Sequence, residues 1–347
     1  MSDRAAESRA RAVPWGRIAL RLFLLAVLLV SLYYFLPQLT RMFERAPELG
    51  AVRYRWFLMM FVLMTGAFTA FWELTRVAVP EVSWFVAATS QLTSNAAAKV
   101  IPGGAVVSGA LYYQMLSVSG VDPGKAAAAL AATSFLSTLV LLSLPAVAVV
   151  IAVLSAPIPD GLLPVAIAGT ALFAVMFVVA VVLVRFDKPL RSIGWLFQHT
   201  LARLAKKFGR DWDVRAENFI DRRNEVVGAL GQRWRKALGV AVTNWLLDYL
   251  TLVIALFAVG ANPSPSLVLL AFAGGAVLGM IPITPGGLGF VEVGLTGLLT
   301  LSGIPGSDAL LATLAYRMFQ FWLPIPAGAV AYVLFRRRYG KPSELAS

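Results

Sequence analysis

The residues ITPGGLGFVEVG, Ile283 to Gly294, interrupt one of the most apolar parts of the chain. They contain one proline, four glycines and a single carboxylate, that of Glu292. Proline and glycine end or kink a helix, and a charged group at the depth of a bilayer is costly and usually functional. The stretch therefore predicts a broken helix inside a membrane, with an acid placed just beyond the break.

The composition indicates a membrane protein. The chain has 347 residues, of which 59% are hydrophobic and 14% are charged, and its mean hydropathy is +0.76. Soluble domains carry about 25% charged residues. We therefore expect an all-α polytopic membrane protein. Apolar runs that reach or approach the length of a bilayer-spanning helix cover residues 18–36, 56–79, 124–155, 161–185, 237–259 and 308–335.

The net charge of +12 does not indicate a nucleic-acid-binding protein, because the cations flank the apolar runs. That arrangement sets membrane orientation, with Lys and Arg retained on the cytoplasmic side. The segment 186–236 carries twelve Lys and Arg against six acids, so we expect it to be cytoplasmic. We expect the same of the N-terminus, 1–17, and of the tail, 336–347. Within the basic segment, 201–234 has the spacing of an amphipathic surface helix, or is a solvated basic loop.

Counting membrane crossings from a cytoplasmic N-terminus gives two helical hairpins. We expect the run 18–36 to be an uncleaved first span, although its arginine-rich flank is also typical of a signal peptide. For 186–236 to lie inside, regions 81–119 and 266–303 must each start and end on one side of the membrane. The first then enters from the cytoplasm and the second from outside. The arginines of 37–55, which should lie outside, oppose this topology.

Two Pro-Gly-Gly triplets stand in the same register of an internal repeat. A constant shift of 183 positions superposes Pro102-Gly103-Gly104 on Pro285-Gly286-Gly287 and Ser119-Gly120 on Ser302-Gly303. The halves 18–185 and 237–335 then each contain a hairpin between flanking spans. Hairpins that enter from opposite sides predict an inverted-topology repeat with two re-entrant hairpins broken at Pro-Gly-Gly, as in transporters with a site at mid-membrane. The alternative is two ordinary turns that link helices.

Polar residues at bilayer depth form the predicted lipid-binding site. We expect Arg317 and Lys99 to hold an anionic headgroup, while Glu292 and Asp248 balance them or carry a coupling proton. The alternative is a buried ion cluster of Glu292, Arg317 and Asp248 that only fixes helix packing. The complete predicted set is Gln91, Asn95, Lys99, Asp248, Glu292, Arg317 and Gln320, with hairpin breaks at Pro102, Gly103, Gly104, Pro285, Gly286, Gly287 and Gly289.

In the first hairpin, Gln91, Asn95 and Lys99 recur every four residues. Such a stripe lies on one face of a helix and lines a cavity or an interhelical seam. Helix N-termini that follow the two breaks would add positive dipole ends suited to a phosphate.

Sequence signatures of enzymes are absent. The chain has no HExxH, Walker or GxSxG motif, and its lack of cysteine excludes a thiolate nucleophile and a Cys-ligated metal. We expect no enzymatic activity, no cofactor, no metal and no nucleic-acid partner.

The motif from Pro285 to Glu292, followed by Tyr316-Arg317, resembles the flippase-like membrane domain of lysylphosphatidylglycerol synthases. The resemblance spans nearly the whole chain and implies movement of a phospholipid or a lipid-linked headgroup between leaflets. No aminoacyl-transferase sequence follows up to Ser347, so it does not imply the synthase activity. In the first repeat Gly109 stands in the register of Glu292, where relatives often carry a polar or charged pair.

Two other functions are compatible with the sequence. A non-transporting scaffold or regulator would hold a lipid-modifying membrane enzyme, with 186–236 as its docking surface. A membrane-embedded transferase would need a catalytic constellation that the sequence does not show. We expect a multi-pass protein of the cell membrane that binds membrane lipids, with both termini cytoplasmic.

Overall fold

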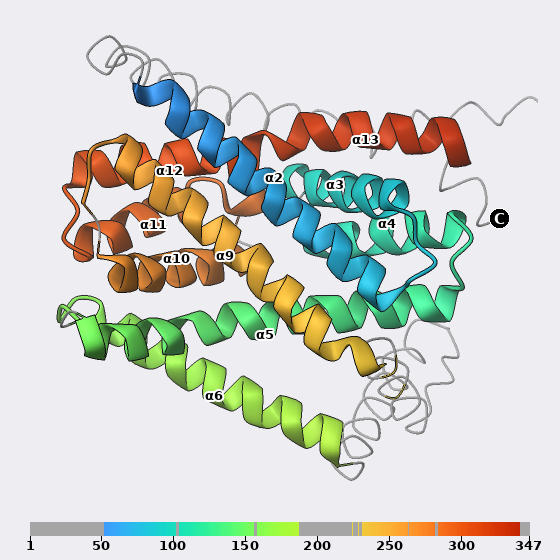
Figure 1. Ribbon diagram of the computed structural model, residues 1–347, viewed down its shortest axis with the longest axis horizontal. Helices are drawn as coiled ribbons and strands as arrows, with labels where there is room; N and C mark the ends of the chain where they lie inside the picture. The colour runs from blue at the N-terminus through green and yellow to red at the C-terminus, as the bar shows by residue number, and fades with distance from the viewer. Residues whose placement is uncertain are drawn as a thin grey trace, which may run out of the picture. The chain divides into compact units, whose positions relative to one another are not determined.

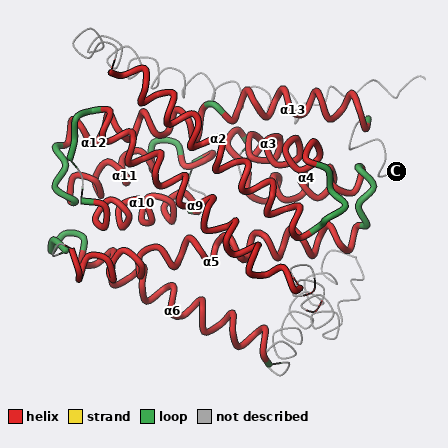
Figure 2. Tube along the Cα trace, in the orientation of Figure 1, coloured by secondary structure: helices red, strands yellow, loops and turns green. Residues whose placement is uncertain are grey.

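The described part of the chain is helical throughout, with short connecting loops and no strand (Figure 2). The predicted span 18–36, most of the basic segment 186–236, and Pro102 and Gly103 lie outside the described residues. The predicted all-α class is confirmed for the rest. The computed structural model describes residues 52–101, 104–155, 158–186, 224, 228, 231–262, 264–281 and 284–340.

The described helices coincide with the predicted apolar runs, and the second predicted break, from Pro285 to Gly289, is present. At the first, one helix ends at Val100 and the next begins at Gly104. Among the described residues, four helices are long and apolar enough to cross a membrane: Tyr54–Ala78, Pro123–Ala152, Gly231–Ala258 and Gly306–Tyr339. The elements are α2 (Val52–Ala78), α3 (Trp84–Val100), α4 (Gly104–Val118), α5 (Pro123–Ser155), α6 (Leu163–Arg185), η2 (Gly231–Arg233), α9 (Trp234–Ala258), α10 (Pro265–Met280), η3 (Pro285–Gly287), α11 (Phe290–Leu301), α12 (Gly306–Arg317), η4 (Met318–Trp322) and α13 (Pro324–Tyr339).

The last span is not a uniform α-helix. Between α12 and α13 the chain forms a single π-helical turn, in which the N–H of Leu323 bonds to the carbonyl of Met318 at 2.9 Å. Pro324 has no N–H, so the helix cannot bond the carbonyl of Gln320 in the usual i to i−4 pattern. π-Turns inside α-helices often occur at functional sites.

Helices α2 and α9, which hold equivalent places in the two repeats, pack side by side in opposite directions (Figure 1). The rings of Trp56 and Phe257 stack at 6.3 Å. Further along, the Asn244 side-chain amide donates to the carbonyl of Ala67 at 2.8 Å. At the far end, Arg233 donates to the carbonyl of Val77 at 3.3 Å, so residue numbers fall on α9 as they rise on α2.

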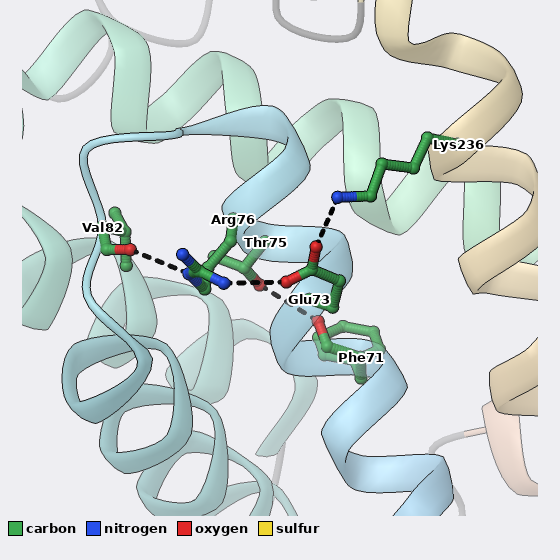
Figure 3. Close-up of polar contacts among 6 residues, drawn as sticks. All are labelled: Phe71, Glu73, Thr75, Arg76, Val82 and Lys236. Atoms are coloured by element: carbon green, nitrogen blue, oxygen red, sulfur yellow. Dashed lines mark hydrogen bonds and ion pairs between the residues drawn. The ribbon is translucent and has the colours of Figure 1, made fainter.

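A charge cluster joins the end of α2 to the start of α9 (Figure 3). The Glu73 carboxylate accepts from Arg76 at 3.0 Å and from Lys236 at 2.6 Å, and Arg76 also donates to the carbonyl of Val82 at 3.2 Å. The Lys236 side chain is 60% exposed, so this pair contributes only about 0–1 kcal/mol. The cluster therefore fixes the register of the helix ends, and apolar packing supplies most of the stability.

Each hairpin packs within itself and against the opposite half of the chain. Helix α3 packs on α4 and on α13, while α10 packs on α11 and on α5. A Cβ on Gly328 of α13 would lie 2.4 Å from the carbonyl oxygen of Leu92, so a glycine there lets α13 and α3 approach closely. A Cβ on Gly104 would lie 2.1 Å from the carbonyl oxygen of Ala98, where the chain turns back after α3.

The two hairpins open toward opposite ends of this helical assembly. In Figures 1 and 2 the loops from α2 to α3 and from α4 to α5 lie at the right, whereas those from α9 to α10 and from α11 to α12 lie at the left. Their tips meet between these ends, because α3 contacts the break η3. A Cβ on Gly286 would lie 3.0 Å from the Cα of Lys99.

Candidate functional site

A cavity of about 500 Å³ lies against the tip of the second hairpin. We call it the charged cavity. Four of the seven predicted polar residues line it, and they come from α3, α9, α12 and the π-turn. These four are Lys99, Asp248, Arg317 and Gln320, and the other lining residues include Trp245, Phe272, Gly286, Tyr316 and Phe321.

The backbone of the second break explains its glycines. Gly286, Gly287 and Gly289 have φ values of 58°, 73° and 77°, a region that other residues rarely adopt. Gly286 is also constrained by space, since a Cβ there would lie 2.4 Å from Cε2 of Phe321. Gly289 has no atom within 4 Å of an added Cβ, so only its backbone conformation requires glycine.

Arg317 connects three parts of the site. Its Nε donates to Glu292 Oε1 at 2.7 Å, its Nη1 to Gln320 Oε1 at 3.0 Å, and its Nη2 to the carbonyl of Gly286 at 3.3 Å. Its guanidinium carbon lies 4.4 Å from the centre of the Phe321 ring. A guanidinium carries more N–H donors than these three acceptors use, so Arg317 can also donate to a ligand in the cavity.

Glu292 lies behind Arg317 and does not line the charged cavity. It sits in the first turn of α11, where the helix dipole favours a carboxylate. Its side chain is 15% exposed and its Oε2 has no hydrogen-bond partner among the described residues. The geometry therefore favours a role for Glu292 in positioning the guanidinium.

Lys99 is a buried cation with no carboxylate partner among the described residues. Its Nζ donates to the backbone carbonyl of Gln320 and lies 5.5 Å from the centre of the Phe321 ring. That carbonyl is available because Pro324 supplies no N–H. Lys99 and Arg317 therefore present two cations to one cavity.

Asp248 accepts a hydrogen bond from the Tyr316 hydroxyl at 2.9 Å. The predicted ion cluster is therefore divided, because only Glu292 pairs directly with Arg317 in the described structure. Tyr316 was missed as a site residue, although a hydroxyl beside Arg317 in an apolar span could have drawn attention to it. Phe272 was also missed; its ring makes edge contacts with Trp245, Tyr249 and Tyr316 at 6.2, 5.8 and 6.3 Å.

Gln91 and Asn95 do not share the charged cavity with Lys99. They line a second cavity of about 340 Å³, which we call the neutral cavity. The Gln91 carbonyl oxygen accepts from Trp72 Nε1 at 3.1 Å. The expected polar stripe is thus divided between two cavities, because eight residues of helix extend about 12 Å. Asp248 and Gln320 line both cavities.

Comparison with known proteins places these features in a family. The sequence profile described as the lysylphosphatidylglycerol synthase TM region matches residues 18–328. Two UPF0104 membrane proteins of Methanothermobacter thermautotrophicus are 32% identical over 91 residues and 26% identical over 99 residues. These alignments cover 26% and 28% of this chain and 27% and 28% of the relatives.

A UPF0104 membrane protein of Methanocaldococcus jannaschii is 26% identical over 98 residues, which are 28% of this chain and 42% of that relative. The profile match, unlike these partial alignments, includes both hairpins and the charged cavity. The chain is therefore a multi-pass membrane protein that belongs to the family of the lysylphosphatidylglycerol synthase TM region.

Proposed function

We propose that this protein moves a phospholipid, or another lipid with an anionic headgroup, between the two leaflets of a membrane. The observation that carries the proposal is the charged cavity, in which Lys99 and Arg317 face one space of about 500 Å³. The family is implicated in lipid flipping, which supports the same substrate class.

The electrostatics of the charged cavity favour an anion. A buried cation is costly unless it is paired. Among the described residues the Lys99 ammonium contacts a carbonyl and an aromatic ring, and the Asp248 carboxylate lines the same cavity but is bonded by Tyr316. Arg317 retains N–H donors beyond the one that it shares with Glu292. A headgroup phosphate would compensate both cations at once.

We further propose that the two hairpins are re-entrant and form an inverted-topology repeat. Helices α4 and α11 end at Val118 and Leu301, and α5 and α12 begin at Pro123 and Gly306, so both pairs keep the shift of 183. The antiparallel packing of α2 on α9 supports opposite orientations for the two halves. Such a pair of hairpins can expose a site between them alternately to the two sides.

The distribution of cations supports a cytoplasmic location for the end that carries the loop from α2 to α3. Lys125 pairs with Glu81 at 3.1 Å, Lys236 pairs with Glu73, and Arg338 lies 5.1 Å from the centre of the Phe85 ring. At the other end the loops from α5 to α6, from α9 to α10 and from α11 to α12 hold no Lys or Arg. By the positive-inside rule the C-terminus then lies in the cytoplasm. An additional span at 18–36 would bring the N-terminus to the same side.

Reconstitution tests this function. Purified protein is placed in liposomes that contain phosphatidylglycerol with a fluorescent acyl chain, and a membrane-impermeant reductant quenches the outer leaflet. Transport predicts quenching of nearly all fluorescence, compared with about half in protein-free liposomes. Half quenching with protein present would contradict the proposal and favour the scaffold function. Formation of a new lipid by the purified protein would instead indicate a membrane-embedded transferase.

A further inference from the structure

Part of the neutral cavity is formed by first-repeat positions whose counterparts in the second repeat line the charged cavity. The shift of 183 takes four residues of the neutral cavity onto four of the charged cavity. These are Ser108, Tyr112, Ser134 and Ser137, which correspond to Val291, Leu295, Arg317 and Gln320. The two cavities are therefore related positions of one repeated architecture.

The first repeat carries no charge at these positions. Ser134 stands in the register of Arg317, and Gly109 stands in the register of Glu292. Apart from Asp248 on the wall shared with the charged cavity, the polar residues that line the neutral cavity are uncharged amides and hydroxyls. A phosphate would find no cation here, whereas an uncharged polar group would find hydrogen-bond partners.

Several of these amides and hydroxyls have unused hydrogen-bonding capacity. Asn95 Oδ1 is buried without a partner among the described residues. The Asn244 amide donates to Ala67, and the Gln91 carbonyl accepts from Trp72, so within the described structure the other polar side-chain atom of each is available. Ser108 and Ser134 also line the cavity. A buried polar group without a partner is destabilising, so this arrangement favours a ligand rich in both donors and acceptors.

Aromatic rings supply the apolar surface of the same cavity. Phe68, Phe71, Tyr112 and Trp245 line it, and the Trp245 Nε1 is held by the carbonyl of Ser137 at 2.9 Å. A cavity with aromatic walls and a few convergent polar groups is typical of small-molecule sites. A ligand rich in hydroxyl groups would bond the polar side chains through its hydroxyls and pack its C–H faces against the aromatic rings.

We propose that the neutral cavity binds an uncharged, hydroxyl-rich group, a polyol or a sugar, carried on the phosphate that the charged cavity holds. This deepens the proposed function and rests on it. Asp248, Trp245 and Gln320 line both cavities, so the two cavities adjoin. A headgroup that reaches past this shared wall would join the cations to Asn95. The protein would then select phosphodiester lipids by the group beyond the phosphate.

Calorimetric titration of the detergent-solubilised chain tests the selection. The probes are dihexanoyl phosphatidylglycerol, dihexanoyl phosphatidylinositol and dihexanoyl phosphatidylmethanol, which share one phosphodiester charge but differ in hydroxyl groups. We expect the first two to bind about tenfold more tightly than phosphatidylmethanol, as one or two additional hydrogen bonds would produce. Equal affinities for all three probes would overturn the inference.

Variants separate recognition from packing. Asn95→Leu should abolish the preference while leaving the affinity for phosphatidylmethanol unchanged. The pair Gly109→Glu with Ser134→Arg should do the same by placing an ion pair in the cavity, and a Cβ at Gly109 meets no atom within 4 Å. Thr243→Val is the matched control, since this exposed hydroxyl bonds only to the carbonyl of Gly239 in its own helix. An equal loss of affinity for all probes in Asn95→Leu would assign Asn95 to packing and overturn the inference.

The binding result is separable from the proposed function. A tenfold preference in a protein that moves no lipid in liposomes would retain the cavity assignment and remove translocation. Translocation without any preference among the three probes would retain transport and remove the cavity assignment.

Discussion

The ammonium of Lys99 donates to the backbone carbonyl of Gln320, which lacks its usual helical partner because Pro324 has no N–H. This contact joins the tip of the first hairpin to the π-turn in the last span. Three features that are distant in the sequence, a lysine, a π-turn and a proline, therefore form one structural unit beside the charged cavity.

Pro324→Ala tests the contact between Lys99, the π-turn and Pro324. The new N–H at 324 can bond the Gln320 carbonyl, so it competes with the Lys99 ammonium for that acceptor, and the π-turn can return to α-helical geometry. We expect lipid transport in liposomes to fall about tenfold while thermal stability is unchanged or increases, because alanine favours a helix interior over proline.

Pro326→Ala is the matched control, because Pro326 is exposed and lies outside the residues that line the charged cavity. It should transport at the wild-type rate. Equal transport by Pro324→Ala and Pro326→Ala would show that the Lys99 contact has no part in transport.

The pair of Arg317 and Glu292 permits a test that separates packing from function. Arg317→Ala leaves a buried carboxylate without its partner, and breaking such a pair costs about 3–5 kcal/mol of unfolding free energy. Glu292→Gln removes the charge that positions the guanidinium while preserving shape. We expect both variants to abolish transport, with the larger fall in melting temperature in Arg317→Ala.

The double variant Arg317→Met with Glu292→Leu replaces the pair by apolar side chains, which is often neutral or stabilising. It should recover stability near the wild-type value and still transport no lipid. Recovery of transport together with stability would mean that the pair only fixes helix packing.

The glycines of the second break should differ in their tolerance of alanine. Gly286→Ala would clash with Phe321 and with the backbone of Lys99, so we expect loss of transport. Gly289→Ala meets no neighbour and carries only the strain of its backbone conformation, φ 77° and ψ −45°, about 1–3 kcal/mol. Transport rates and thermal melts measure both effects.

Gly297→Ala in α11 is the control, because it is helical and an added Cβ meets no atom within 4 Å. It should raise stability by about 0.5–1 kcal/mol and leave transport unchanged. Wild-type transport by Gly286→Ala would refute the assignment of the break to the site.

The proposed topology can be mapped with single introduced cysteines, because the chain has no native cysteine that would have to be replaced first. Lys125→Cys and Ser307→Cys lie on exposed residues just after the first and second hairpins. In intact right-side-out cells, an impermeant maleimide should label Ser307→Cys alone, and both variants should react once the membrane is permeabilised. Labelling of both sites before permeabilisation would exclude opposite entry of the hairpins.

The helices and the second break were predictable because local sequence determines them. Apolar runs of bilayer length and a Pro-Gly-Gly triplet act through chain geometry that needs no partner. The division of Gln91, Asn95 and Lys99 between two cavities was not predictable, since it depends on where α9 and the last span cross α3. The missing helical partner of the Gln320 carbonyl could have been inferred, because a proline inside a helix removes the N–H that would bond the carbonyl four residues earlier. Its partner, Lys99, required the tertiary structure.

The crossed packing of the halves has a consequence for biogenesis. Helix α3 rests on α13, so the first hairpin lacks one of its walls until synthesis has passed α13, more than 200 residues after α3. A nascent chain must therefore keep Gln91, Asn95 and Lys99 in a provisional environment, at the translocon or with an insertion factor, until α13 is inserted.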